Sequence, residues 1–462
     1  MLAAGGLVVA GAATGAAAAA AGANRPTGGR SGVGTEGGGG SLRNAALTPA
    51  TARLTPKPRQ PGQLFFPDRP MGTDQIPEIE HIVVVMMENH SFDTILGMLG
   101  RGDGFTLGPQ GRPTNWNPNG HGGRLRAFHM PTPCQLQHKP SQSWNASHAQ
   151  FEGGKLEGFV TSASGPVAMG YFTPKDMPFT NSLARTFPLA DRWFCSLLGQ
   201  TYPNRRYLLA GTSLGMINDT FDMALPPNGT ILEHFHANRI SWKNYFFSPK
   251  GTPSVYVWMG LLGKKWVVDG TVPIGRFFSD ANKGALPAFS LVDPNFTKSS
   301  EENPQDVQFG DVFLSKVVQA VMHGPKWRET LLIWCYDEHG GYYDHVVPPP
   351  APVPDDVPPD LTKGDVKASF DQYGFRVPAG VVSAYAKKGY VSPVVFDHTS
   401  ILALVEQKWN LPALTKRDAA AKAPLDMLDF SAPAFAKPPH LAAPADPARR
   451  AGCLLTGPGK IP

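Results

Sequence analysis

The sequence predicts an α/β fold in which helices cover both faces of a largely parallel sheet. Two apolar runs of strand length, 81–87 and 330–336, have no polar alternation, and the first is rich in β-branched residues. Buried parallel strands have this pattern. A shorter apolar run covers 288–292, and segments with helical apolar spacing alternate with these runs. We therefore expect a three-layer α/β/α sandwich.

The run at 81–87 ends at the polar pair Glu88-Asn89. Residues 92–99 then have the apolar spacing of a helix, with Ser91 as its N-cap and Gly100 as its stop. A buried helical segment is the alternative interpretation of the first run. The favoured order is strand, polar turn, helix.

The same order recurs downstream. The spacing predicts a helix over 311–322 that ends near Gly324, and the strand at 330–336 stops at Asp337-Glu338. A further helix is expected over 400–409, with Thr399 as its N-cap. Ligands of open α/β sheets gather at the carboxyl ends of the strands, so both acidic pairs occupy expected positions for a site.

Long irregular segments interrupt these elements. The chain has 50 Gly and 46 Pro among 462 residues. Segments 101–180 and 225–287 are interpreted as loop insertions, and the proline-rich run 348–354 as a surface loop. The aromatic residues of the second insertion fit either an apolar lip for acyl chains or ordinary core packing.

Four regions are expected along the chain. Residues 1–23 resemble an export signal, although a flexible Ala/Gly tail has the same composition and a basic start is missing. A flexible lead-in over 24–75 precedes a domain at 76–435, and an irregular tail covers 436–462. The expected location is secreted, periplasmic or in the cell envelope.

Charge and cysteine content exclude some classes of protein. The net charge is +5, from 42 basic and 37 acidic residues without dense basic runs, so we expect no nucleic-acid partner. Four scattered cysteines are too few for a disulfide scaffold or a cysteine metal cluster. Cys335 lies inside an apolar run and is expected to be a buried thiol.

The two strand-end pairs indicate a metal site. Glu88, Asn89, Asp337 and Glu338 supply three carboxylates and an amide oxygen. Burial of such groups is unfavourable unless they are paired or bind a cation. Their oxygens suit Mg²⁺, Ca²⁺ or Mn²⁺, and nearby histidines add Zn²⁺ and Fe. Ordinary helix-capping turns are the alternative for either pair alone.

A threonine precedes a third helix. Pro203 suits a first helical turn, which predicts Thr201 or Tyr202 at the N-cap and a stop at Gly211. A hydroxyl at this position, close to Arg205, lies where a phosphoryl group would be held. The simpler interpretation is that Thr201 only caps the helix.

Four motifs, at 88–93, 201–205, 337–345 and 397–400, together resemble the bacterial phosphatidylcholine-type phospholipase C and acid phosphatase family. Plant non-specific phospholipases C belong to the same group. The resemblance extends from about residue 76 to residue 411. It implies an alkaline-phosphatase-like fold and one divalent metal ion. The implied metal ligands are Glu88, Asn89, Thr201, Asp337 and Glu338.

By the same resemblance, Thr201 is the nucleophile that forms a phosphothreonine intermediate. His148 and His345 are expected to contact phosphate or transfer protons. The implied phosphate-binding residues are Arg205, His339 and His398, although both histidines could instead only orient their neighbours. Many relatives have a histidine before proline where this chain has Asn303. Asn303 is also an expected phosphate-binding residue, because its amide can donate a hydrogen bond to a phosphoryl oxygen, although it cannot transfer a proton.

The expected activity is phospholipase C-type hydrolysis of a phospholipid head-group diester. The alternative is an acid phosphatase that acts on phosphomonoesters, because the same nucleophile and metal serve both reactions. A catalytically reduced phosphate- or lipid-binding protein is a third hypothesis, prompted by Asn303. Expected partners are a phospholipid or a small phosphate ester, with transient contact at a membrane surface.

Overall fold

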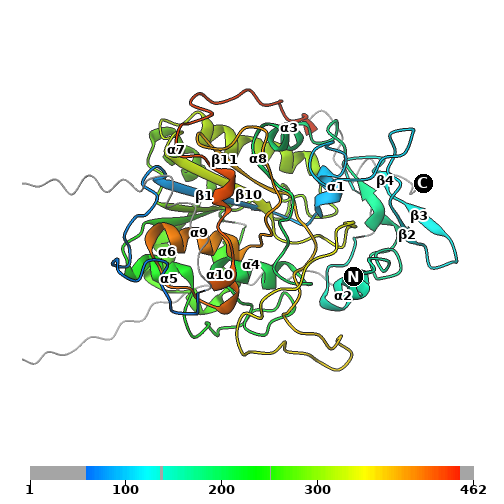
Figure 1. The fold of residues 1–462 in the computed structure, drawn as a ribbon, viewed down its shortest axis with the longest axis horizontal. Helices are drawn as coiled ribbons and strands as arrows, with labels where there is room; N and C mark the ends of the chain where they lie inside the picture. Colours follow the sequence, from blue (N-terminus) through cyan, green and yellow to red (C-terminus); the bar gives the residue numbers. More distant parts are fainter. Residues whose placement is uncertain (1–58, 136–138, 250, 448–462) are drawn as a thin grey trace, which may run out of the picture. The chain divides into compact units, whose positions relative to one another are not determined.

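The computed structural model describes residues 59–135, 139–249 and 251–447, and within them an eight-stranded sheet lies between two layers of helices (Figure 1). The strand order is β12-β6-β11-β10-β1-β9-β7-β8. The strands of this sheet are β1 (His81–Met87), β6 (Leu189–Ala190), β7 (Trp242–Phe246), β8 (Thr271–Pro273), β9 (Phe289–Val292), β10 (Thr330–Tyr336), β11 (Ala379–Ser383) and β12 (Val391–Ser392).

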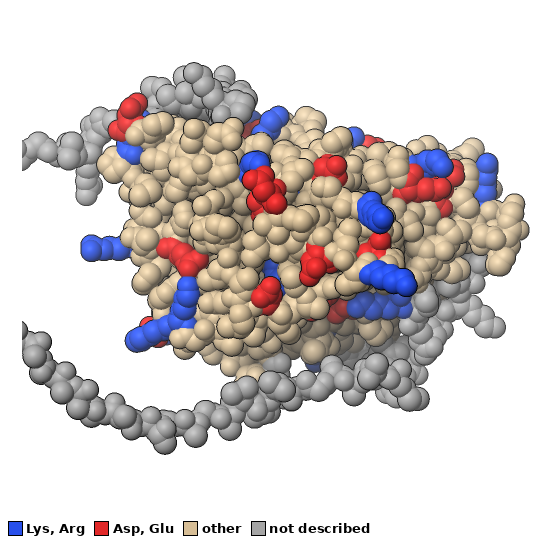
Figure 2. Space-filling model, turned by 90° about the horizontal axis from the view of Figure 1, so that it is seen from below, with Lys and Arg blue, Asp and Glu red and all other residues tan. Residues whose placement is uncertain are grey.

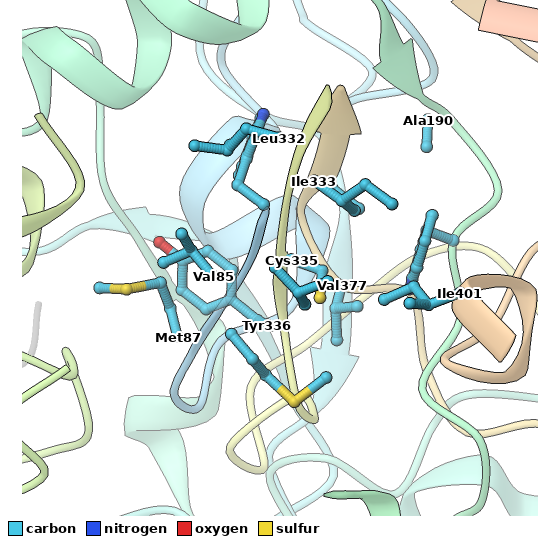
Figure 3. Packing of buried hydrophobic residues seen from close by; sticks show 14 of the residues in the cluster. Val85, Met87, Ala190, Leu332, Ile333, Cys335, Tyr336, Val377 and Ile401 are labelled. Carbon is cyan, nitrogen blue, oxygen red and sulfur yellow. The ribbon is translucent and has the colours of Figure 1, made fainter. Parts of the chain in front are cut away.

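The centre of the sheet is parallel. β1 lies between β10 and β9, with Met87 opposite Tyr336 and Val85 opposite Val292. Every residue of β1 and β10 is buried, which confirms the predicted strands at 81–87 and 330–336. Figure 3 shows side chains of both strands packed among apolar neighbours such as Ile401. Because the strands run in the same direction and in register, the residues that follow them leave the sheet side by side.

Helices cover both faces, which confirms the predicted three layers (Figure 1). One face carries α3 (Pro178–Thr186), α7 (Ile274–Lys283) and α8 (Val307–Met322). The other carries α4 (Thr201–Ala210), α5 (Ile231–Ala237), α6 (Lys265–Gly270), α9 (Thr399–Trp409) and α10 (Lys416–Ala420).

Several helix ends differ from the prediction. α8 begins at Val307 and not at 311, because Asp306 caps it by accepting a hydrogen bond from the Gln308 amide. α1 (Phe92–Leu96) has the predicted Ser91 cap but ends at Gly97. A Cβ at Gly97 would lie 2.6 Å from the Phe105 ring. In α9, Thr399 is the first helical residue and His398 occupies the N-cap.

The segment 225–287 is part of the core, so its interpretation as a loop insertion was wrong. It supplies β7 and β8 to the main sheet and three covering helices, α5, α6 and α7. Strand pairing with β9 outweighs the local Gly and Pro content that suggested a loop. Its five-residue strand β7 has mixed polarity, WKNYF, and therefore no clear apolar run.

The segment 101–180 is largely irregular, as predicted. Its regular elements are β2 (Trp116–Pro118), β3 (Arg124–Arg126), β4 (Phe128–His129), α2 (Trp144–Phe151) and β5 (Gly170–Tyr171). Short 3₁₀ helices occur at η2 (Glu152–Gly154), η3 (Pro166–Met169), η4 (Ser254–Val257), η5 (Met259–Leu261) and η6 (Pro424–Met427).

The folded domain begins before the predicted boundary at 76. Arg59 donates to Glu406 at 2.6 Å and Lys408 donates to Asp74 at 2.7 Å, so residues 59–75 pack on α9. This part of the predicted lead-in was therefore wrongly interpreted as flexible. Residues 436–446 form no helix or strand. The predicted boundary at 436 stays a prediction. The predicted export signal at 1–23 lies outside the described residues.

Over the part of the chain that the structure describes, none of the helices has the length and apolar content needed to cross a membrane. Cys335 is a buried free thiol, as predicted, and so is Cys195. Cys134 is disulfide-bonded.

Candidate functional site

The ends of β1 and β10 form the base of the candidate site. The Asp337 amide donates to the Met87 carbonyl at 3.2 Å, which continues the pairing of the two strands beyond their last residues. The next turn brings Gly340 against the chain at Asn89. A Cβ on Gly340 would lie 1.9 Å from the Asn89 carbonyl oxygen, and its φ is +66°. Only glycine fits here, so the sequence after β10 permits the two acidic pairs to meet.

Several polar atoms of these pairs are buried without a partner. Glu88 Oε2, both side-chain polar atoms of Asn89, and Glu338 Oε1 find no hydrogen-bond partner among the described residues. Such atoms are rare in folded proteins because their desolvation is unfavourable. Two carboxylate oxygens and an amide oxygen left in this state fit a divalent cation. The donor set of the predicted metal site is therefore consistent with its chemistry.

Burial also changes the protonation of the three carboxyl groups. It raises the pKa of Glu88 and of Glu338 well above the ordinary value, and that of Asp337 to about 6. Arg205 opposes this effect at Glu88 and Asp337. Positive charge next to these groups therefore favours their ionised form.

Arg205 connects the two strand ends. Its Nε donates to Asp337 Oδ2 at 2.9 Å, and its Nη2 lies 3.6 Å from Glu88 Oε1. Its Nη1 donates to Ser254 Oγ at 3.1 Å, and Ser254 donates in turn to Asp293, which follows β9. Burial would lower the pKa of Arg205, but Asp337 and Glu88 raise it. The guanidinium is thus a fixed, fully charged group at this position.

Thr201 begins α4, and the prediction that it or Tyr202 is the N-cap was wrong. The N-cap is Gln200, which has an extended backbone. The amide of Tyr202, in the first turn, donates to Asp219 Oδ1 at 2.7 Å. The Asp219 carboxylate, from another segment, thus accepts a hydrogen bond from a free amide of the first helical turn, and the Thr201 hydroxyl is not used as the cap. The predicted stop at Gly211 is confirmed, with φ +71°.

Thr201 lines a cavity of about 340 Å³ together with Glu88 and Arg205. The hydroxyl, a proposed ligand and the guanidinium therefore share one open space. Four aromatic residues form much of the wall: Tyr202, Phe221, Tyr256 and Phe296. Asp219 and Glu302 add two carboxyl groups.

His339 and His398 hold the turn after β10. His339 Nε2 lies 2.7 Å from Gln150 Oε1, and His398 Nε2 lies 2.6 Å from the Asp337 carbonyl. Burial lowers the pKa of His339 to about 3 and that of His398 to about 4. Both rings are therefore neutral at pH 7, and the contact of His398 favours an orienting role.

The structure does not bring His148 or His345 to the described wall of the cavity that contains Thr201. His148 Nδ1 lies 2.7 Å from the Trp144 carbonyl in α2, and burial lowers its pKa. His345 Nδ1 lies 2.7 Å from Asp93 Oδ2. Their proposed catalytic roles stay predictions.

Asp93, Asp344 and His345 form a second group with the composition of a metal site. Arg376 already lies among them, with its Nε 2.9 Å from Asp344 and its Nη2 3.3 Å from Asp93. An internal cation thus compensates the two carboxylates. The pairs at 88–89 and 337–338 therefore remain the better metal site.

Asn303 donates from Nδ2 to the Tyr342 hydroxyl at 3.0 Å, and Tyr342 donates to Gln135. Its predicted phosphate contact stays a prediction. Sequence reasoning missed Asp219, Glu302, Ser254 and Lys139, whose ammonium pairs with Glu302. No motif marks Asp219 or Ser254, whereas Glu302 directly precedes Asn303 and could have been considered with it.

The protein-family model described as "Phosphoesterase family" matches residues 79–412, which include the whole candidate site. This chain belongs to the Phosphoesterase family. It is accordingly a hydrolase that acts on phosphoric ester bonds, and the predicted family resemblance is confirmed.

Curated relatives of this phosphoesterase include non-specific phospholipase C6 of Arabidopsis thaliana, 30% identical over 74% of this chain and 71% of that protein. Phospholipase C B of Mycobacterium tuberculosis is 30% identical over 79% of this chain and 80% of the relative. A solved structure from the alkaline phosphatase superfamily of Vibrio parahaemolyticus covers 71% of this chain and 76% of its own, with 12% identity and a TM-score of 0.35. A TM-score this low adds nothing to the fold, which the strand order establishes.

Proposed function

We propose that this phosphoesterase is a metal-dependent enzyme of phospholipase C type that uses Thr201 as its nucleophile. The observation that carries the proposal is a set of buried, unpartnered oxygen atoms on Glu88, Asn89 and Glu338, of which Glu88 lines the same cavity as the Thr201 hydroxyl. The names of the curated relatives support a phospholipid diester as the substrate.

Glu88, Asn89, Asp337, Glu338 and the Thr201 hydroxyl would hold the divalent ion. A bound cation of this kind lowers the pKa of a coordinated hydroxyl and neutralises charge on phosphoryl oxygens. These ligands are compatible with Ca²⁺, Mg²⁺, Mn²⁺, Zn²⁺ and Fe.

In the proposed reaction, Thr201 Oγ1 attacks phosphorus in line, and the bond from phosphorus to the diacylglycerol oxygen breaks. Diacylglycerol leaves with a proton, and a phosphothreonine ester remains. Water then attacks phosphorus, restores the hydroxyl and releases the phosphorylated head group. Arg205 would stabilise the charge on the phosphoryl oxygens, because its ion pairs keep it positioned and charged.

We also propose that the enzyme is exported and works outside the cytoplasm. There it would make transient contact with a lipid surface. The disulfide at Cys134 supports an oxidising compartment. Acidic and basic side chains are interspersed on the face shown in Figure 2.

The nucleophile is tested with Thr201→Ala and Thr201→Ser, using p-nitrophenyl phosphorylcholine and p-nitrophenyl phosphate. Removal of the hydroxyl is expected to lower kcat by about 1,000-fold or more, and Thr201→Ser to keep most of the activity. Thr186→Ala in α3 is the matched control. Full activity of Thr201→Ala would disprove the assignment.

The same assays separate the other hypotheses. Release of phosphocholine supports the lipase, whereas inorganic phosphate from the monoester alone supports an acid phosphatase. Activity should be lost on chelation and return with one added metal, whose identity elemental analysis of the purified protein would give. Absence of metal-dependent turnover of either ester would favour the reduced, ligand-binding protein.

A further inference from the structure

We propose that a second cavity, beside the catalytic one, binds an acyl chain of the phospholipid substrate. It has a volume of about 590 Å³, within the range of about 300–1,000 Å³ typical of ligand sites. Its wall includes Phe247, which follows β7, and residues of α7 and α8. These two helices lie on the side of the sheet opposite α4 (Figure 1). This inference rests on the proposed function.

The wall of this acyl cavity is chiefly apolar. Its larger apolar side chains are Phe247, Ile274, Phe278, Phe309, Val312 and Phe313. The rings of Phe247 and Phe313 are 5.8 Å apart between centroids, and Phe247, Ile274 and Phe278 pack on the main core. Because these half-buried rings pack on the main core, the apolar space between them is preformed, and such a space favours a hydrocarbon ligand.

One short loop separates this cavity from the catalytic one. Asn295 lines both cavities, Phe296 faces the catalytic side, and Lys298 and Ser299 face the acyl cavity. The Asn295 side chain accepts hydrogen bonds from the amide and hydroxyl of Thr297, at 3.0 and 2.8 Å. The loop is thus held in one shape, with the catalytic cavity on one side and the acyl cavity on the other.

Two exposed lysines border the acyl cavity. Lys298 Nζ lies 5.1 Å from the centroid of the Phe309 ring, and Lys316 lies on the same cavity wall in α8. Asp446 also lines the cavity. Cationic groups around an apolar opening suit a chain that enters from a phospholipid surface, because the lysines can contact lipid phosphates while the hydrocarbon is buried.

The test fills the cavity. Gly275 lines it and has an ordinary φ, and a Cβ added there would meet no other atom within 4 Å, so Gly275→Trp can be accommodated. Val312→Trp blocks it from α8. Val268→Trp is the matched control, because Val268 is 52% exposed on α6 and lines neither cavity over the described residues.

The assay compares p-nitrophenyl phosphorylcholine, which lacks acyl chains, with monomeric dibutyroyl and dioctanoyl phosphatidylcholine. For the wild type, kcat/KM should rise at least about tenfold from the C4 to the C8 lipid, because each added methylene is removed from water. Both blocking variants should lose this rise and keep the p-nitrophenyl rate. The control should behave as the wild type.

An unchanged chain-length dependence in both blocking variants would overturn the inference. The inference would also fail if both blocking variants lost thermal stability and kept the wild-type chain-length dependence. The cavity would then be needed for packing of the protein and not for binding of the lipid. Failure of the proposed function is distinct, because the wild type would then hydrolyse none of the three esters. In that case titration with cis-parinaric acid decides: binding by the wild type and not by Gly275→Trp supports the cavity, and equal or absent binding refutes it.

Discussion

At the residue scale, His345 shows how position decides the role of a titratable group. Its Nδ1 lies 2.7 Å from Asp93, and its Nε2 lies 3.2 Å from Asp103. Burial alone would lower the pKa of His345, but Asp93, and to a lesser extent Asp344, raise it to about 9. The imidazolium therefore belongs to an ion-pair cluster with Arg376 and supports the chain just beyond the candidate site.

The pH dependence of stability should report this ion pair. The pKa of His345 is about 9 in the folded protein and near 6.5 in the unfolded chain. Protonation of His345 therefore stabilises the fold fully below about pH 6.5, and this stabilisation is lost as the pH rises through about 9. The unfolding free energy of the wild type relative to His345→Gln should therefore fall by about 3 kcal/mol over this window.

Urea unfolding at several pH values measures this difference. A pH-independent gap between the two proteins would contradict the ion-pair role. A fall in kcat of His345→Gln under conditions where it is fully folded would instead support its predicted part in proton transfer.

At the scale of elements, the site depends on the close approach of two strand ends. Glu88 and Asp337 follow neighbouring parallel strands, and the turn at Gly340 presses against Asn89. Strand register places the two pairs next to each other, and the turn at Gly340 holds their chain segments in contact. The helix α4 then brings Thr201 to the cavity that Glu88 also lines.

Gly340→Ala should disrupt this approach. The new Cβ would lie 1.9 Å from the Asn89 carbonyl oxygen. We therefore expect the free energy of unfolding to fall by more than about 2 kcal/mol and the variant to lose its bound metal. Gly389→Ala is the matched control, because Gly389 has φ +62° and a Cβ added there would have nothing within 4 Å.

Thermal unfolding and metal content of both variants separate the contact from the backbone strain. If Gly340→Ala loses no more stability or metal than Gly389→Ala, the close approach is not needed for the site.

At the scale of the whole molecule, the segment ahead of β1 is tied to the distant helix α9. Arg59 and Glu406 are both buried, and the guanidinium donates to the carboxylate at 2.6 Å. Burial raises the pKa of Glu406 well above its ordinary value, and Arg59 opposes this effect. Arg59 therefore compensates the buried charge of Glu406, although the two residues are far apart in the sequence.

Removal of Arg59 should destabilise the whole domain. Arg59→Met leaves Glu406 buried without its cation, so the unfolding free energy should fall by about 3 kcal/mol. Activity at 25 °C should be unchanged, because Arg59 lies outside the described lining of the catalytic cavity. Lys265→Met, at an exposed pair with Asp269, should have little effect.

The double variant Arg59→Met/Glu406→Gln checks the cause. It should recover part of the lost stability, since the carboxylate at 406 is removed together with its cation. Equal loss in the single and double variants would show that packing of the arginine, and not its charge, stabilises this segment.

The buried strands, the acidic pairs behind them and the order of the motifs are properties of local sequence. Continuous apolar runs such as 81–87 admit few other structures, and residues that follow such runs must lie at the sheet edge. The layered fold and the residues Glu88, Asn89, Asp337 and Glu338 could therefore be predicted without a structure.

Contacts between distant segments settled the rest. The membership of 225–287 in the sheet came from pairing with β9, which overrides a weak local pattern. Asp219, and not Thr201, serves the start of α4, because it accepts from the Tyr202 amide across 17 positions of sequence. His345 joined Asp93 across 252 positions, and the acyl cavity is lined by five segments that are separate in the sequence. Such contacts depend on how the layers pack, and no local pattern in the chain encodes them.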